Sequence, residues 1–190
     1  LMVRRKTVGS DLQLGLLNDE EVKTFTVNQY FGGGLVCSTE KLAEIDYDRL
    51  MNLRHVMPAV NTEPVPRKLT DCERFQSQID VKVTSPWGDE WHTVVFVNWG
   101  DEPMPLSVSL DTLICGGFIK DGEKYAVSTF YSRMLIKDAV SGGTYSLGFI
   151  APHGAEIVRI GKTGRAQVVL SDAHYSFGAE LDYVGDDGIK

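Results

Sequence analysis

The sequence has little of what marks a disulfide-stabilised or zinc-bound fold. Its three cysteines, Cys37, Cys72 and Cys115, are odd in number and widely spaced, and none belongs to a Cys-x-x-Cys pair. We therefore predict buried free thiols, with no disulfide framework and no zinc site. Free thiols favour a reducing compartment such as the cytoplasm, although the sequence leaves the compartment open.

The sequence also lacks the features that mark binding to a metal, a membrane or nucleic acid. The four histidines share no ligand spacing, so we expect no metal and no cofactor. No apolar run approaches the ~20 residues that span a bilayer. The chain carries 19 Lys and Arg against 26 Asp and Glu. This negative net charge disfavours nucleic acid or an anionic membrane as a binding partner. With 43% hydrophobic and 24% charged residues, the chain has an ordinary globular composition and can bury a core.

The first third of the sequence alternates between strand and helix patterns. Residues 18–21, Asn-Asp-Glu-Glu, predict a capped helix start, and helical spacing continues, which predicts a helix over Asp19 to Phe31. The three glycines at 32–34 end it, and a second helix is expected over Asp46 to Met57, before Pro58.

Two short apolar runs accompany these helices. Residues 1–3 and 35–37 are predicted strands, so this part is typical of an α/β unit within a barrel. Residues 61–66 hold two prolines and no periodicity, and we interpret them as a linker.

Beyond residue 66 the pattern is typical of an antiparallel β-sandwich. Turn signals separate short strand candidates at roughly ten-residue spacing. We expect strands at Phe75 to Thr84, Glu90 to Trp99, Leu106 to Leu110, Tyr125 to Tyr131, Tyr145 to Ile150, Ala155 to Ile160 and Gln167 to Leu170.

Both ends look cut through structure. The chain opens on apolar strand-like residues, and it closes on a strand, an Asp-Gly turn at 187–188 and the start of a return strand. We therefore expect the chain to be a fragment of a larger protein.

Several segments resemble one enzyme family in order and spacing. Residues 32–42, Gly-Gly-Gly-Leu-Val-Cys-Ser-Thr-Glu-Lys-Leu, with residues 53–58, Leu-Arg-His-Val-Met-Pro, resemble the last barrel strand and helix of α-galactosidases in glycoside hydrolase families 27 and 36. Residues 94–103 resemble a segment of their C-terminal β-domain, as do residues 150–160. The resemblance covers about residues 1–160.

This resemblance implies a fold and a mechanism for a larger parent. The fold class is then an α+β fragment: the last βα units of a (β/α)8 barrel followed by an antiparallel β-sandwich. The parent would hydrolyse terminal α-galactosides by a retaining mechanism with two carboxylates. Both carboxylates would precede residue 1, so we assign no catalytic residue here and expect the fragment to be inactive. Arg4 and Ser38 follow barrel strands and are our candidates for substrate contact.

Other suggestive residues have plainer interpretations. Asp101 and Glu102 lie in a turn and are interpreted as solvated. His153 is expected to order a turn. Trp91 and Trp99 lie eight positions apart, so we expect both on one buried strand face, and Trp87 is the best candidate for exposure.

The sequence predicts three segments: 1–63 as terminal βα units of the barrel, 64–163 as the β-sandwich, and 164–190 as the start of a further β-module. The expected partner is a carbohydrate in the parent, with self-association through exposed barrel edges. Two other hypotheses stay open. One is a carbohydrate-binding module without hydrolase activity, which exposed aromatics would favour, and the other is a structural domain.

Overall fold

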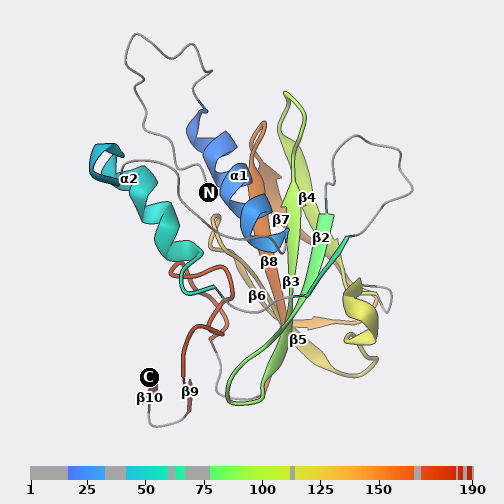
Figure 1. Ribbon diagram of the computed structural model, residues 1–190. Coiled ribbons are helices and arrows are strands. Elements are labelled where there is room, and N and C mark those ends of the chain that lie inside the picture. The colour runs from blue at the N-terminus through green and yellow to red at the C-terminus, as the bar shows by residue number, and fades with distance from the viewer. Residues whose placement is uncertain are drawn as a thin grey trace.

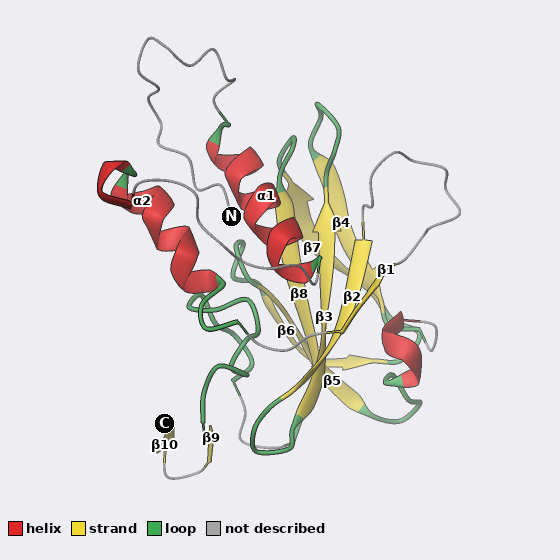
Figure 2. Ribbon diagram, in the orientation of Figure 1, coloured by secondary structure: helices red, strands yellow, loops and turns green. Residues whose placement is uncertain are grey.

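The structure is a computed structural model that describes residues 17–32, 42–59, 63–66, 78–111, 114–164, 168–182, 184–185 and 188–189. In these ranges the helical elements before residue 60 lie to one side of antiparallel sheets (Figures 1 and 2). None of the described helices is long and apolar enough to cross a membrane. The elements are α1 Asp19–Phe31, η1 Leu42–Glu44, α2 Tyr47–Leu50, η2 Met51–His55, β1 Glu63–Pro66, β2 Gln78–Thr84, β3 Glu90–Val97, β4 Met104–Ser109, η3 Ile114–Gly117, β5 Lys124–Thr129, β6 Leu135–Val140, β7 Thr144–Ile150, β8 Ala155–Lys162, β9 Val184–Gly185 and β10 Gly188–Ile189.

Helix α1 has the bounds that the sequence predicts. Asn18 Oδ1 accepts a hydrogen bond from the backbone N–H of Glu21 at 2.9 Å, and the Glu21 carboxylate accepts one from the N–H of Asn18 at 2.6 Å. This capping box satisfies two of the orphan donors at the helix start. The helix ends at Gly32, whose N–H donates to the Asn28 carbonyl at 2.8 Å.

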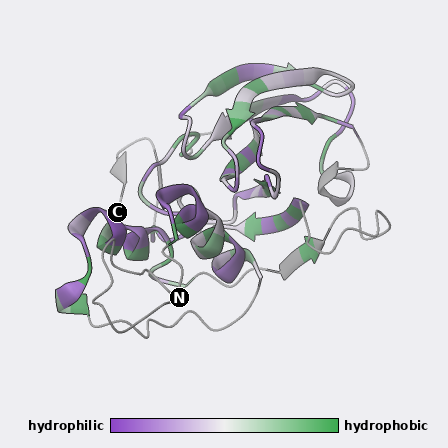
Figure 3. Cartoon of the chain, turned by 90° about the horizontal axis from the view of Figure 1, so that it is seen from above, coloured by the Kyte–Doolittle hydropathy of each residue, from purple (hydrophilic) through white to green (hydrophobic). Residues whose placement is uncertain are grey.

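The buried side of α1 faces the sheet. Val22, Val27, Tyr30 and Phe31 are each at most 5% exposed. Phe25, which also fits the helical spacing, is 37% exposed and points away from this core. Figure 3 shows hydrophilic and hydrophobic residues interleaved on the helices, as expected for elements with one face in solvent.

The second helical segment is less regular than predicted. A continuous helix is expected over Asp46 to Met57, but the chain forms a single α turn, α2, followed by the 3-10 helix η2. Asp46 makes no side-chain capping bond, and Val56 is the one fully buried apolar residue of this segment. Because short helices depend on packing for stability, little here enforces regular α geometry.

An ion pair joins this segment to α1. The side chain of Arg49 is 5% exposed, and its Nη2 donates to Asp19 Oδ1 at 2.9 Å and to the Leu17 carbonyl at 2.7 Å. The guanidinium therefore fastens α2 to the N-terminal turn of α1.

The strands form two main sheets. The larger has the order β1-β2-β3-β8-β5-β6, the smaller pairs β4 with β7, and every recorded pair is antiparallel. The expected antiparallel sandwich is confirmed. After Pro66 the described residues hold no helix longer than the four-residue η3.

Two local predictions are wrong, and one strand was missed. Glu63–Pro66, interpreted as linker, forms strand β1 at the sheet edge, a place that tolerates proline because an edge strand leaves one row of N–H groups unpaired. Strand β6, at the other edge, was not predicted. Of the strand expected at Gln167 to Leu170, the described residues 168–170 are not in a strand. The strands expected at 1–3 and 35–37 lie outside the described residues, so the barrel part of the fold class stays a prediction.

The large sheet is covered on both faces, which explains why β8 is buried along nearly its whole length. Between it and the β4–β7 pair lies a sandwich core that contains Val94, Leu106, Val108, Leu110, Tyr125, Val127, Leu147, Val158 and Ile160. Between its other face and the helical elements lies a helical-side core that contains Val27, Tyr30, Phe31, Val56, Val81, Trp91, Phe130, Ile157, Tyr175 and Phe177.

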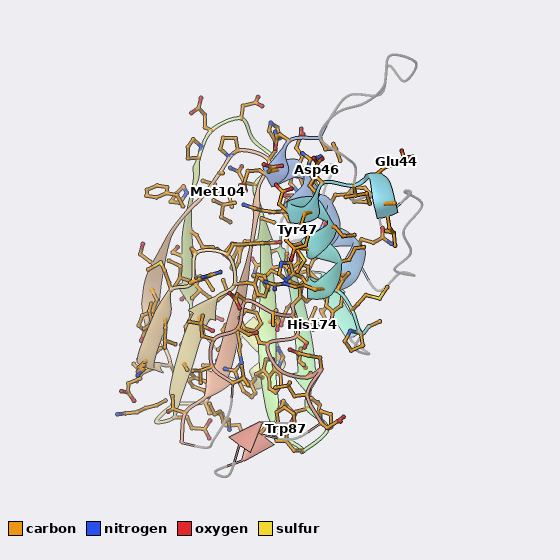
Figure 4. The ribbon with its side chains drawn as sticks, turned by 90° about the vertical axis from the view of Figure 1, so that its left-hand side faces the viewer. Glu44, Asp46, Tyr47, Trp87, Met104 and His174 are labelled. Atoms are coloured by element: carbon orange, nitrogen blue, oxygen red, sulfur yellow. The ribbon has the colours of Figure 1, made fainter. Side chains whose placement is uncertain are left out.

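The segment after β8 returns to the helical-side core. Tyr175 and Phe177 are fully buried, and the N–H of Tyr175 donates to the His55 carbonyl at 2.9 Å. His174, labelled in Figure 4, lies in the same segment. Farther on, β9 and β10 pair antiparallel, as the predicted terminal hairpin requires.

Candidate carbohydrate-binding groove

A groove of about 500 Å³ lies between the outer side of α1 and the turn after β3. Trp99 and Phe25, which are 39% and 37% exposed, are its aromatic components. The described residues that line it are Leu17, Glu21, Thr24, Phe25, Asn28, Gln29, Trp99 and His153.

Trp99 faces outward because β3 ends before it. Asn98 is buried, and its Nδ2 donates to the carbonyls of Glu102, Ile150 and Ala151 at 2.8, 3.3 and 3.1 Å. Its Oδ1 accepts from the Gly100 N–H at 2.9 Å. This network turns the chain at Asn98, so the strand alternation does not continue to Trp99. The prediction that Trp99 is buried with Trp91 is therefore wrong.

His153 holds the opposite loop in place. Its Nε2 is 2.9 Å from Asp101 Oδ1, and its N–H donates to the Gly100 carbonyl at 3.3 Å. Its own carbonyl accepts from Thr24 Oγ1 of α1 at 2.6 Å. The expected role of His153 in ordering a turn is confirmed, and the residue also joins that turn to the helix.

The helix supplies the polar side of the groove. Asn28 donates through Nδ2 to the Thr24 carbonyl at 3.0 Å, which fixes the orientation of its amide. Glu21 is the one carboxylate among the described lining residues, and it is engaged in the capping box. Glycoside cleavage needs two carboxyl groups about 5–5.5 Å apart in the retaining mechanism. The groove is thus suited to binding a neutral ring on an aromatic surface, and its described residues do not supply such a pair.

The other tryptophans are not part of the groove. Trp91 is 1% exposed and donates through Nε1 to the Ser176 carbonyl at 3.0 Å. Trp87 is partly buried, stacks on Trp91 with ring centroids 6.4 Å apart, and donates to Asp89 Oδ2 at 3.0 Å. The predicted exposure of Trp87 is only partial, and the described residues present no row of tryptophans on one sheet face.

The remaining candidates are an acidic turn, possible metal ligands and two predicted substrate contacts. The side chain of Asp101 is 93% exposed, which confirms a solvated turn. In the described part of the chain no three His, Cys, Asp or Glu side chains come together as a metal site. Arg4 and Ser38, the candidates for substrate contact, lie outside the described residues, as do the side chains of all three cysteines.

Sequence reasoning missed how the groove is assembled. No sequence motif marks Phe25 or Asn28 as groove residues, and Asn98 lies within the longer segment 94–103. The Asn-Trp-Gly-Asp order at 98–101 carries the available signal, because an Asx residue followed by glycine favours a turn.

The fold of this chain is similar to that of known proteins, although its sequence matches none of them closely. No protein-family model matches the sequence, and no curated protein is similar enough to count as a relative. Solved structures do match, and they include glycoside hydrolases of the α-galactosidase type. The expected likeness to that family is therefore confirmed for the fold.

Three of these structures define the likeness. A proposed α-N-acetylgalactosaminidase from Bacillus halodurans has a TM-score of 0.58 and 13% identity, over 86% of this chain and 37% of that one. An α-galactosidase from Saccharomyces cerevisiae, solved with raffinose, has a TM-score of 0.55 and 9% identity, over 80% and 46%. A family 27 β-L-arabinopyranosidase from Geobacillus stearothermophilus has a TM-score of 0.54 and 13% identity, over 86% and 37%. The chain spans less than half the length of each.

Proposed function

We propose that this chain is the C-terminal, non-catalytic portion of a glycoside hydrolase of the α-galactosidase type. The main support for this proposal is the similarity of fold. The matched region covers 80–86% of this chain but only 37–46% of the three solved structures. A matched region of that size, rich in antiparallel strands, is what the resemblance implies for the end of such an enzyme.

The catalytic carboxylates of the parent would then lie outside this chain. The carboxylates at the groove and its turn have other roles: Glu21 caps α1, and Asp101 is solvated and contacts His153. In the parent, one carboxylate would attack the anomeric carbon while the other protonates the leaving oxygen and then activates water, without a cofactor. The role proposed for the chain is structural support of that catalytic domain.

The finer division of the chain belongs to the same proposal. Residues 1–63 would be the last βα units of the barrel, 64–163 the sandwich, and 164–190 the start of a further β-module. Arg4 and Ser38 would contact the galactoside. Tyr175 and Phe177 pack with Phe31 and Val56, so a break at 164 would separate side chains that share one core.

Self-association is also proposed, through apolar side chains that a full barrel would cover. Leu42, Tyr47 and Met57 are 51%, 76% and 54% exposed, and all three lie in or beside the second helical segment. Figure 4 shows Tyr47 on α2, close to Asp46 and Glu44.

The test is hydrolysis of an aryl α-galactoside by two matched preparations. The 190-residue chain alone should give no turnover above buffer, because positioned acid–base groups contribute roughly 10²–10⁴-fold in rate and would be absent. The same chain extended at its N-terminus with the sequence encoded upstream should hydrolyse the substrate. Turnover by the chain alone that is abolished by Glu21→Gln or Asp101→Asn would overturn the proposal.

A second candidate function is carbohydrate binding without hydrolysis. The observation that favours it is the pairing of exposed Trp99 with Phe25 in a groove that also holds amide side chains. The C–H face of a pyranose ring is apolar and stacks on such aromatic surfaces, while amides bond to its hydroxyls.

A further inference from the structure

A second concave site lies at the opposite end of β3 from Trp99. It is a cleft of about 620 Å³ beside the β2–β3 turn, the end of β8 and the loop around η3. In Figure 4, Trp87 marks the β2–β3 turn at one end of the molecule, and Met104, near the Trp99 turn, lies at the other. The described lining residues are Lys82, Gly88, Asp89, Glu90, His92, Gly116, Gly117, Phe118, Lys120, Lys162 and Thr163.

One lining residue of this cleft, His92, is paired with a buried carboxylate behind it. Asp80 of β2 and His92 of β3 have side chains only 3% and 8% exposed, with Asp80 Oδ1 at 2.8 Å from His92 Nδ1. Since an ionised carboxylate only accepts hydrogen bonds, Nδ1 carries the proton. Within the described residues Nε2 makes no hydrogen bond, so it is the ring atom that can accept one from a ligand in the cleft.

Two lysines lie on the same sheet face as this histidine. Lys82 is the direct cross-strand partner of His92, and Ile160 is its partner on β8, which places Lys162 two residues along on that face. The ring of Phe118 lies against both: its centroid is 5.0 Å from that of His92 and 5.7 Å from Lys162 Nζ. The register of three strands thus brings two ammonium groups to the edge of one buried imidazole.

Both ammonium groups are paired with carboxylates. Lys82 Nζ is 2.6 Å from Glu90 Oε2, and Lys162 Nζ is 2.8 Å from Glu123 Oε2. An ammonium has three N–H donors, so it can donate to a ligand oxygen as well as to a carboxylate. Lys120 adds a third cation to the lining. The described lining thus holds three lysines and the two carboxylates of Asp89 and Glu90.

We propose that this cleft binds a small oxyanion that also carries a hydroxyl group, such as hydrogen phosphate or a sugar acid. The lysines donate to the anionic oxygens, and charge-assisted bonds of this kind are roughly twice as strong as neutral ones. His92 Nε2 accepts the ligand's hydroxyl proton in a hydrogen bond, with its ring held in place by Asp80. A neutral sugar offers only hydroxyls, so it lacks the group that the lysines recognise. This site is separate from the Trp99 groove and does not depend on the proposed function.

The experiment titrates the 190-residue chain with inorganic phosphate, glucuronate and neutral methyl glucoside, by calorimetry and by NMR of the histidine ring protons. Phosphate or glucuronate should bind saturably and shift the His92 ring signals, while methyl glucoside should not. Phosphate alone would indicate a free inorganic ion as the ligand, and glucuronate alone would indicate a sugar acid; either result supports an oxyanion site.

Matched lysine variants test the geometry without disturbing the core. Lys162→Gln should weaken binding by about tenfold or more, because a charge-assisted hydrogen bond is lost. Lys137→Gln, at an exposed position on β6, should leave it unchanged. Glu123→Gln should tighten binding, since it removes a carboxylate that competes for Lys162. The proposal is overturned if neither anion binds saturably, if Lys162→Gln and Lys137→Gln bind equally well, or if methyl glucoside binds as tightly as glucuronate.

Discussion

The two faces of the six-stranded sheet are covered in different ways. The sandwich core joins residues from one stretch of the chain, Val94 to Ile160, and it is mainly aliphatic. The helical-side core joins residues as far apart as Val27 and Ala179, and six of its described buried residues are aromatic, against two in the sandwich core. Tyr175 alone packs against Tyr30, Phe31, His55, Phe130 and Tyr131.

The helical-side core also contains buried polar groups whose pKa values are shifted. Arg159 is fully buried with its guanidinium 5.0 Å from the Trp91 ring, and burial lowers its pKa to about 10. Burial also raises the pKa of the Tyr131 and Tyr175 hydroxyls, which hydrogen-bond to each other. Buried polar groups are stable only while their partners stay in place. We therefore expect the helical side to be more sensitive to mutation and to pH than the sandwich side.

The largest effect should come from emptying the helical-side core. Phe31 is fully buried between Tyr30 and Tyr175, so Phe31→Ala should lower the free energy of unfolding by about 3–5 kcal/mol. Leu147→Ala, a matched truncation in the sandwich core, should cost about 2–5 kcal/mol. Urea denaturation followed by circular dichroism measures both.

The shape of these transitions tests whether the two sides are independent. Strand β8 contributes Ile157 to one core and Val158 to the other, so a single cooperative transition is expected in both variants. A separate early transition in Phe31→Ala, with the later one at the wild-type midpoint, would show that the sandwich folds without the helical side.

A smaller effect is expected at the turn that carries Trp99. Asn98→Ala removes the donor to three carbonyl groups, and unsatisfied buried groups of this kind cost about 1–3 kcal/mol. Asn52→Ala is the control, because Asn52 Nδ2 makes a single bond of 3.2 Å to the Arg49 carbonyl. Equal losses in the two variants would mean that the turn is held mainly by its backbone bond between Asn98 and Gly154.

Acidification should weaken the helical side. Burial is the main cause that lowers the pKa of His55 and His174 below their ordinary value of 6.5. The unfolded chain then binds protons that the folded chain refuses, so stability present above the ordinary value is lost as the pH falls toward the folded pKa. The free energy of unfolding should therefore decrease as the pH is lowered from about 7.5 to about 5.5. The double variant His55→Gln with His174→Gln should show a weaker dependence of the unfolding free energy on pH. An unchanged dependence would mean that carboxylates cause it instead.

Local sequence signals predicted much of the fold. The bounds of α1 follow from the Asn18–Glu21 capping box and Gly32, which act over a few residues. Most sandwich strands follow from apolar runs between turn signals. Strand β6 escaped prediction because Leu135–Val140 does not alternate, and Asp138 within it has a positive φ of 58°.

Features that depend on contacts between residues distant in sequence could not be predicted from the sequence. The pairing of Asp80 with His92 is set by strand register, and nothing near either residue in the sequence indicates it. The exposure of Trp99 depends on carbonyl groups of residues 150 and 151 that receive the Asn98 amide. The return of Tyr175 to the helical-side core is likewise a long-range contact. Tertiary packing decided each of these positions.

The smallest stability effect, and the sharpest test of the groove, is expected from Trp99→Ala. Its side chain is partly in solvent and Asn98 holds the turn without it, so the change should cost about 1 kcal/mol or less. If the groove binds sugar, the same change should remove saturable binding of methyl α-galactoside, because the stacking surface is lost. Phe149→Ala is the matched control, since Phe149 is 72% exposed on β7 and does not line the groove. Binding that survives Trp99→Ala but is lost with Phe149→Ala would move the site to the outer face of the β4–β7 sheet. Absence of binding in the wild-type chain would leave the groove as a packing surface and favour the non-catalytic, structural role.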